Sequence, residues 1–81
     1  MVTIYTMEHC PYCKQAKVLL KERGVPFTEH KMEDEAQWSA LFAKSPLRTV
    51  PQIFSGTELI GGYTDLAKID ATTKLVHLKQ Q

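Results

Sequence analysis

Two cysteines three residues apart lie near the start of the 81-residue chain, at the boundary between a strand-like and a helix-like segment. Val2–Thr6 is rich in β-branched and aromatic residues, a composition that favours a buried strand. Pro11 directly follows Cys10, and proline is favoured at the first position of a helix because no helical partner awaits its missing N–H group. Three apolar residues then recur at helical spacing: Ala16, Leu19 and Leu20. The sequence therefore predicts a strand that leads into a helix, with Cys10 and Cys13 in the first turn.

The rest of the chain alternates between helix-like and strand-like segments. We expect the first helix to end at Arg23, because Gly24 follows it. The further elements expected are a strand over Pro26–Lys31, a helix over Asp34–Lys44, strands over Pro51–Phe54 and Glu58–Ile60, and a helix after Gly61-Gly62. The residues expected to be buried are Trp38, Leu41 and Phe42 in the second helix, and Leu66, Ile69 and Val76 in the last.

The order of these elements, β-α-β-α-β-β-α, predicts an α/β fold built on a four-stranded mixed sheet. A helix between the first two strands makes them parallel through a right-handed crossover. The short turn at Ser55-Gly56-Thr57 makes the last two strands antiparallel. Helices on both faces would cover the sheet. This is the thioredoxin-like layout, in which a Cys-x-x-Cys pair lies at a strand–helix junction.

Length and composition narrow the classes of function. Eighty-one residues suit a single domain over residues 1–81, and a net charge of +1 gives no overall field that favours nucleic acid or an anionic membrane. No apolar run approaches the roughly 20 residues that span a bilayer, and the first residues lack the pattern of a signal peptide. We therefore expect a cytoplasmic protein with no nucleic-acid or membrane partner. In that compartment a close cysteine pair is more often catalytic or metal-binding than a structural staple.

The expected geometry of the cysteine pair favours redox chemistry. Cys10 falls at the N-cap and Cys13 at the third helical position, so one turn can hold a reversible disulfide between them. Free backbone N–H groups and the positive end of the helix dipole then point at the Cys10 sulfur and favour its thiolate form. We expect Cys10 to attack a substrate and Cys13 to resolve the mixed disulfide.

Three other uses of the pair stay open at this point. One is a structural disulfide, and another is an iron–sulfur cluster shared between two chains with outside thiols. The third is half of a zinc site, although four ligands are usual there and the chain has no second Cys-x-x-Cys. The histidines do not form a local ligand pair with the cysteines; they are His9, His30 and His77.

Three segments together carry a specific resemblance. They are Cys10-Pro11-Tyr12-Cys13, Thr49-Val50-Pro51-Gln52-Ile53-Phe54 and Gly61-Gly62-Tyr63-Thr64-Asp65-Leu66. In order and spacing they resemble the dithiol branch of the glutaredoxin family, across nearly the whole chain. The resemblance implies a glutathione-dependent thiol–disulfide oxidoreductase, with glutathione as co-substrate and with Cys10 and Cys13 as its catalytic residues.

The resemblance also implies a glutathione groove beside Cys10. In it, Pro51 is cis, and the extended Val50 offers its backbone N–H and C=O groups to the substrate. The N–H groups at the start of the last helix take the α-carboxylate of the γ-glutamyl end, and Asp65 takes its amino group. Arg48 is similar to the cation that faces the glycine carboxylate in many members, and Lys14 adds to the same patch. The implied binding residues are Tyr12, Arg48, Thr49, Val50, Pro51, Gly62, Tyr63, Thr64 and Asp65.

Each of these residues also has a plainer interpretation. Val50-Pro51 can be a simple turn before a strand, and Asp65 can serve only the dipole of its own helix. Surface cations such as Arg48 and Lys14 are usually just solvated. Tyr12 can pack against its own helix instead of lining a groove.

One position departs from the family pattern. Many glutaredoxins carry a lysine or arginine three residues before the first cysteine, and this chain has Met7 there. The departure removes one cation that would help to hold glutathione or the thiolate. His9, next to Cys10, is a partial substitute if it carries charge near neutral pH; the alternative is a solvated loop histidine.

The expected function is reduction of protein–glutathione mixed disulfides through Cys10 alone, and of protein disulfides through Cys10 and Cys13 together. The first rival is a small redoxin that thioredoxin reductase reduces and that serves as hydrogen donor to ribonucleotide reductase. The second rival is a non-enzymatic iron–sulfur carrier with glutathione as ligand. The expected partners are glutathione and glutathionylated proteins, with ribonucleotide reductase as one candidate. We expect a monomer that holds no metal.

Overall fold

The computed structural model describes residues 1–75 and residue 78. Its elements are β1 (Val2–Thr6), α1 (Pro11–Glu22), β2 (Phe27–Lys31), α2 (Glu35–Lys44), β3 (Gln52–Ser55), β4 (Glu58–Gly61) and α3 (Tyr63–Thr73). The predicted order β-α-β-α-β-β-α is confirmed. Across the described residues, no helix has the length and apolar character that a membrane crossing requires.

The four strands form one mixed sheet, as predicted, and the structure gives their order in it as β2-β1-β3-β4. β1 pairs parallel with β2 and antiparallel with β3, and β3 pairs antiparallel with β4. Because β3 runs against β1, the start of β3 lies beside the end of β1, where Gln52 is opposite Tyr5. The end of β4 reaches the same edge, where Gly61 is opposite Ile53. The topology therefore brings the chain after β1, before β3 and after β4 to one edge of the sheet.

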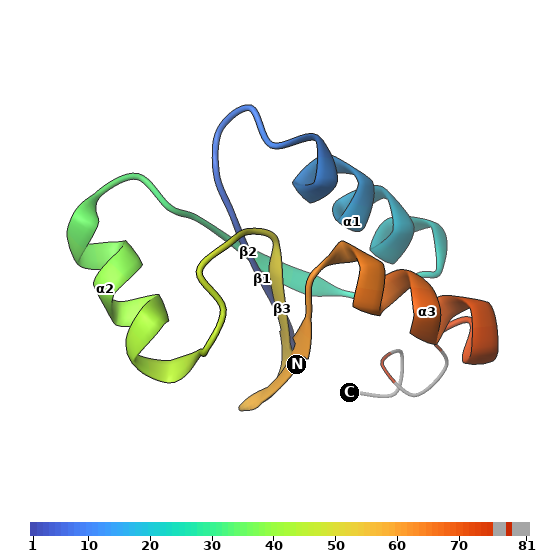
Figure 1. The fold of residues 1–81 in the computed structure, drawn as a ribbon. Coiled ribbons are helices and arrows are strands. Elements are labelled where there is room, and N and C mark those ends of the chain that lie inside the picture. Colours follow the sequence, from blue (N-terminus) through green and yellow to red (C-terminus); the bar gives the residue numbers. More distant parts are fainter. Residues whose placement is uncertain (76–77, 79–81) are drawn as a thin grey trace.

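Helices cover both faces of the sheet, with α1 and α3 on one face and α2 on the other (Figure 1). The larger core lies under α1 and α3; its buried residues include Ile4 and Ile53 from the sheet, Leu20 from α1 and Leu66 from α3. The smaller core lies under α2; its buried residues are Met32, Leu41 and Phe54. The alternation of side chains along a strand sends Ile53 to one core and Phe54 to the other.

Several boundaries differ by one residue from those that the sequence predicts. Asp34 is the N-cap of α2 instead of its first residue, because its carboxylate accepts a hydrogen bond from the Gln37 backbone N–H at 2.9 Å. Pro51 precedes β3 instead of opening it, consistent with the missing N–H of proline. The first helix ends at Glu22, with Arg23 as its C-cap. Gly24 adopts φ +70°, the left-handed conformation that ends many helices.

The predicted burial of α2 is only partly right. Leu41 is buried, whereas Trp38 and Phe42 are only half-buried. Trp38 packs at the margin of the smaller core, and its ring lies 5.5 Å from the ring of Phe42. The reason is that, in the part of the chain that the structure describes, α2 is alone on its face of the sheet and no second helix covers its flank. Val76, predicted to be buried, and His77 lie outside the described residues.

Candidate functional site

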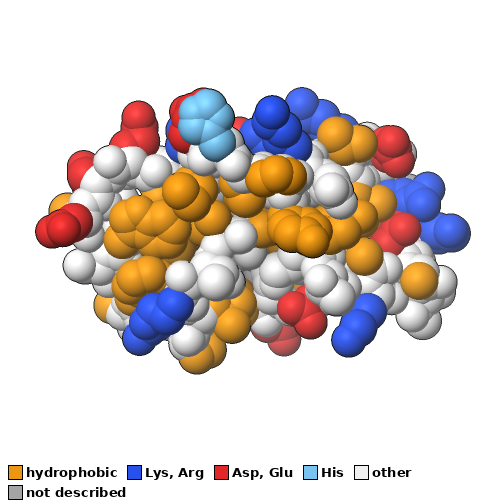
Figure 2. All heavy atoms as spheres, turned by 45° about the horizontal axis from the view of Figure 1, so that its top comes forward, with side chains coloured by type: hydrophobic (Ala, Val, Ile, Leu, Met, Phe, Trp, Pro, Cys, Tyr) orange, Lys and Arg blue, Asp and Glu red, His pale blue; other side chains and the backbone are white. Residues whose placement is uncertain are grey.

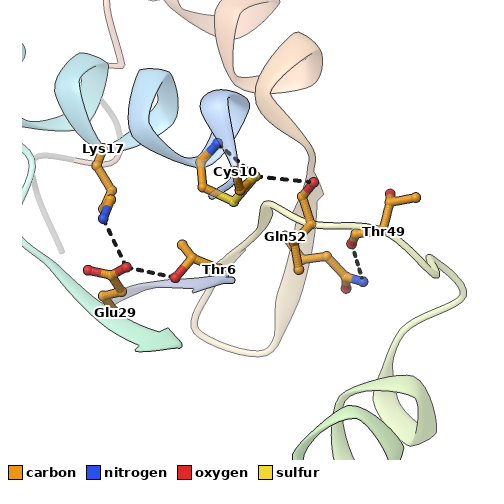
Figure 3. The surroundings of a disulfide bond; sticks show 8 residues. Thr6, Cys10, Lys17, Glu29, Thr49 and Gln52 are labelled. Carbon is orange, nitrogen blue, oxygen red and sulfur yellow. Dashed lines mark hydrogen bonds and ion pairs between the residues drawn. A yellow bond between two sulfur atoms is a disulfide. The ribbon is translucent and has the colours of Figure 1, made fainter. Parts of the chain in front are cut away.

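A disulfide between Cys10 and Cys13 closes the first turn of α1 (Figure 3). Cys10 is the N-cap of the helix, and its Sγ accepts a hydrogen bond from the Cys13 backbone N–H at 3.2 Å. Pro11 occupies the first helical position, as predicted. Cys13 is 2% exposed, whereas Cys10 is partly exposed. Cys10 is therefore the sulfur that an incoming substrate can reach.

The charges around Cys10 favour an anion at its sulfur. The first turn of α1 contains no acidic residue that would oppose the positive end of the helix dipole. Glu8, two residues before Cys10, forms an ion pair with Lys31 at 2.9 Å. That hydrogen bond and the charge of Lys31 hold the pKa of Glu8 below its ordinary value. The carboxylate nearest to Cys10 in the sequence is thus offset by a cation, and the helix N-terminus remains to stabilise a thiolate.

One side of the space next to Cys10 is a loop of residues 47–51, which we call the loop wall. The peptide bond between Val50 and Pro51 is cis, as the resemblance implied. The carbonyl oxygen of Val50 lies 4.0 Å from Cys10 Sγ. The loop wall has no regular secondary structure, and side chains hold its backbone in place. Ser45 Oγ accepts a hydrogen bond from the Leu47 backbone N–H, and the side chains of Arg48 and Gln52 donate to carbonyl oxygens of the loop.

The opposite side is the turn of residues 61–65 that leads from β4 into α3, which we call the helix wall. Gly61 adopts φ +129°, a conformation that is essentially restricted to glycine. Gly62 is the N-cap of α3 and has no side chain with which to cap the helix. The carboxylate of Asp65 accepts a hydrogen bond from the Gly62 backbone N–H at 3.1 Å. The helix wall is therefore a helix N-terminus with first-turn N–H groups available to an anion.

A groove of about 250 Å³ lies between the two walls. Every predicted binding residue lines it except Arg48, and Leu47 lines it in addition. Tyr12 from α1 and Tyr63 from α3 stack over it, with ring centroids 6.1 Å apart. The walls approach closely, because a Cβ added to Gly62 would lie 3.4 Å from the Pro51 carbonyl oxygen. The side chain of Tyr12 is 60% exposed and lines this groove, so it does not lie only against its own helix.

Arg48 lines a second hollow, of about 410 Å³, which Cys10 itself lines and which shares Thr49 and Val50 with the groove. Its guanidinium donates to the backbone oxygens of Ser45 and Leu47 at 3.1 and 3.2 Å and covers the ring of Phe42 at 4.6 Å. Met7 and His9 line the same hollow. Arg48 therefore lies in the hollow that contains Cys10 and not in the groove, and Met7 adds no cation to that hollow.

The hollows lie on a largely apolar face. Figure 2, which turns the top of Figure 1 forward, shows hydrophobic side chains as a band across the molecule, with charged side chains mostly along its margins. Met7 at 44% exposed and Tyr12 at 60% exposed are among the large hydrophobic side chains that reach solvent.

Lys14 lines a separate hollow along α1 and not the one that holds Arg48, so the structure does not bring these two cations together.

Two residues of this region were missed by the sequence reasoning. Leu47 lines the groove, and the buried Gln52 holds the loop wall from behind. Leu47 has no local signal, because it follows the proline that ends α2. For Gln52 the one hint was a polar residue directly after the predicted cis proline, at the start of a short strand.

A polar cluster lies behind the cysteines at the end of β1. The buried hydroxyl of Thr6 donates to the Glu29 carboxylate at 2.7 Å, and Lys17 from α1 donates to the same oxygen at 3.0 Å (Figure 3). The Thr6 hydrogen bond, followed by Lys17, holds the pKa of Glu29 below its ordinary value. Through Lys17, the cluster ties the middle of α1 to strands β1 and β2. Among the described residues, no three side chains of His, Cys, Asp or Glu lie close enough together to hold a metal ion.

Comparison with known proteins finds one family for this arrangement. Residues 2–60 match the sequence model of the glutaredoxin family. The chain is 45% identical over 71 residues to glutaredoxin 3 of Escherichia coli K12, which covers 86% of each protein. It is 41% identical over 75 residues to a glutaredoxin of Pseudomonas aeruginosa, covering 91% of this chain and 89% of that protein. The crystal structure of a buckwheat glutaredoxin–glutathione complex superposes with a TM-score of 0.86 at 26% identity, covering 98% of this chain and 76% of the other.

Proposed function

The chain belongs to the glutaredoxin family of glutathione-dependent thiol–disulfide oxidoreductases, and we propose that it reduces protein–glutathione mixed disulfides through Cys10. Protein disulfides follow a second route that uses both Cys10 and Cys13. One observation carries the proposal: the reachable Cys10 sulfur lies at a helix N-terminus and 4.0 Å from the Val50 carbonyl oxygen, beside the groove. The Cys10-Pro11-Tyr12-Cys13 sequence supports assignment to the dithiol branch.

In the first route, the Cys10 thiolate attacks the glutathione sulfur of the mixed disulfide. A bond forms between Cys10 Sγ and that sulfur, the original disulfide breaks, and the substrate leaves as a thiolate that takes a proton from water. The thiolate of a second glutathione then attacks the glutathione sulfur held on Cys10. Glutathione disulfide leaves and the Cys10 thiolate is restored, so one glutathione is consumed for each substrate thiol released.

The two walls bind the glutathione part during these steps. Backbone groups of Val50 pair with the cysteinyl unit of glutathione beside the Cys10 sulfur. The first-turn N–H groups of α3 take the γ-glutamyl carboxylate, where the helix dipole favours negative charge. The Asp65 oxygen that is not bonded to Gly62 takes the amino group. Arg48 faces the glycine carboxylate from the second hollow.

In the second route, Cys10 attacks a protein disulfide and forms a mixed disulfide with one of its sulfurs. Cys13 then attacks Cys10 Sγ, which releases the second substrate thiol and leaves the Cys10–Cys13 disulfide. Two glutathione molecules reduce this disulfide in turn and leave as glutathione disulfide. The burial of Cys13 suits this resolving role, because it is shielded from outside disulfides but lies one helical turn from Cys10.

Two single variants test the assignment of roles. Cys10→Ser is expected to lose turnover of both a glutathionylated peptide and a protein disulfide. Cys13→Ser is expected to keep turnover of the glutathionylated peptide and to lose the protein-disulfide route. Turnover is followed through NADPH oxidation with glutathione and glutathione reductase. Loss of both activities in Cys13→Ser would show that the roles are wrongly assigned.

The same assay separates the proposal from its two rivals. We expect turnover when glutathione and glutathione reductase supply the electrons, as in the cytoplasm that we propose as its compartment. Thioredoxin reductase is not expected to support turnover. Efficient turnover with thioredoxin reductase alone would favour the first rival, a hydrogen donor whose candidate acceptor is ribonucleotide reductase. A purified protein with visible absorbance from an iron–sulfur cluster would favour the carrier.

A further inference from the structure

Gln52 is a fully buried polar residue that lies behind the groove. It is 0% exposed and directly follows the cis bond between Val50 and Pro51. Its Nε2 group donates to the Thr49 carbonyl oxygen at 2.9 Å, which Figure 3 shows, and to the Leu47 carbonyl oxygen at 3.2 Å. Both carbonyls belong to the loop wall. One side chain thus holds two points of a segment that has no secondary structure of its own.

The other end of the same amide is unsatisfied. Gln52 Oε1 is buried and has no hydrogen-bond partner in the described part of the chain. A buried polar atom without a partner is unfavourable, and an apolar side chain of similar shape would fill the same space without this defect. Packing alone therefore does not account for a glutamine at this position. The feature that only the amide supplies is its pair of N–H donors.

β3 connects this anchor to the reacting sulfur. Gln52 is paired with Tyr5 of β1, and β1 leads into the loop that carries Cys10. The loop wall and Cys10 are thus held to the same edge of the sheet, and the Val50 oxygen lies 4.0 Å from Cys10 Sγ. A loop wall released from Gln52 would no longer keep the Val50 backbone at that distance.

We propose that Gln52 is a positioning residue: its amide holds the loop wall in the conformation that binds the glutathione part of the substrate. The inference rests on the proposed function, because it concerns the affinity of the same groove. Gln52 does not contact the reacting atoms, so it acts on substrate binding and not on the chemical step. Its removal therefore raises KM and leaves kcat unchanged.

The test compares two variants in the glutathione-coupled assay with a glutathionylated peptide. Gln52→Met keeps the unbranched shape and removes both donors, so KM is expected to rise about three- to tenfold, the range for losing one or two hydrogen bonds. Gln52→Asn keeps the amide on a shorter chain that reaches at most one carbonyl, so its KM should fall between wild type and Gln52→Met. In both variants kcat should stay within about twofold of wild type. Gln15→Met, an exposed glutamine of α1 outside the groove, is the matched control.

The outcomes are distinct. Turnover by the wild type together with unchanged KM in both variants would overturn the role of Gln52 while leaving the proposed function intact. A fall in kcat with unchanged KM would also overturn it, because a loop that only binds substrate cannot act in that way. If Gln52→Met does not fold, Gln52→Asn decides by the same criterion. A wild type without glutathione-coupled turnover would instead contradict the proposed function.

Discussion

The two walls of the groove are held in place by different physical means. The helix wall is held locally: Gly61 supplies an unusual backbone conformation, and Asp65 bonds to the N–H of Gly62 three residues before it. The loop wall has no such conformation of its own and is held by side chains just beyond its two ends, Ser45 before it and the buried Gln52 of β3 after it. The helix wall can therefore be recognised from a few consecutive residues, whereas the loop wall depends on the packing of β3.

The comparison predicts how each wall responds to change. A substitution that removes the glycine conformation or the internal hydrogen bond of the helix wall should disturb stability and binding together, because the same few atoms serve both. A substitution behind the loop wall should disturb binding with little loss of stability, because the buried amide of Gln52 is itself only half satisfied. Gln52→Met, described above, tests the loop wall; the predictions below test the helix wall and then two sites outside both walls, from the largest expected effect to the smallest.

The largest effect is expected from Gly61→Ala in the helix wall. Gly61 adopts φ +129°, and an added Cβ would collide with the Asp65 side chain. We expect the free energy of unfolding to fall by about 1–3 kcal/mol and the KM for a glutathionylated peptide to rise. Urea-induced unfolding measures the first quantity. Gly24→Ala is the control, because Gly24 also has a positive φ but faces open space. This variant should lose less free energy of unfolding than Gly61→Ala, and its KM should not change.

Two substitutions of Asp65 separate its structural and binding roles. Asp65→Asn keeps an oxygen for the Gly62 N–H but removes the charge, so stability should hold while KM rises about tenfold or more, as for the loss of a hydrogen bond to a charged group. Asp65→Ala removes both and should also lower the free energy of unfolding by about 1 kcal/mol. An Asp65→Asn protein with wild-type KM would restrict Asp65 to the start of α3.

Met7 allows the missing cation to be restored. Met7→Lys places a charge at the second hollow, and we expect KM to fall about two- to threefold at low salt, the modest value of an exposed charge. The gain should vanish at high ionic strength, where exposed charges are screened. The same substitution should partly rescue Arg48→Ala, because both cations would face one carboxylate. If neither Met7→Lys nor Arg48→Ala changed KM, the glycine carboxylate of glutathione would not bind in this hollow.

Glu29 lies in neither wall and gives the smallest effect. Its pKa is lowered in the folded protein, so its contribution to stability is present above the unfolded pKa and is lost as pH falls through the folded pKa. Glu29→Gln should therefore lower the free energy of unfolding by about 0.5–1 kcal/mol at pH 7. The difference from wild type should shrink below the ordinary pKa of 4.5. Urea unfolding at pH 7 and pH 3.5 measures this, and KM at pH 7 should not change.

Much of the fold and part of the site could be predicted because their causes are local. Pro11 after Cys10 fixes the start of α1, and the resulting N-cap geometry determines which sulfur is reachable. Prediction was less successful where the cause lies elsewhere in the chain. The half-buried state of Trp38 reflects the absence of a second helix beside α2 among the described residues, which helical spacing alone does not reveal. Arg48 was expected in the groove but lines the second hollow, where its guanidinium lies over the ring of Phe42 from α2.

The sequence by itself determined the chemistry and the local conformations: a cysteine pair in one helical turn, a proline before a strand, and two glycines before a helix. Only the tertiary structure decided that these segments meet. β3 runs antiparallel to both β1 and β4, so the end of β1, the start of β3 and the end of β4 lie at one edge of the sheet. The same packing buries Gln52 where its amide reaches the loop wall. The physical reason is that consecutive residues set backbone conformation, whereas sheet register sets which distant segments come within hydrogen-bonding distance.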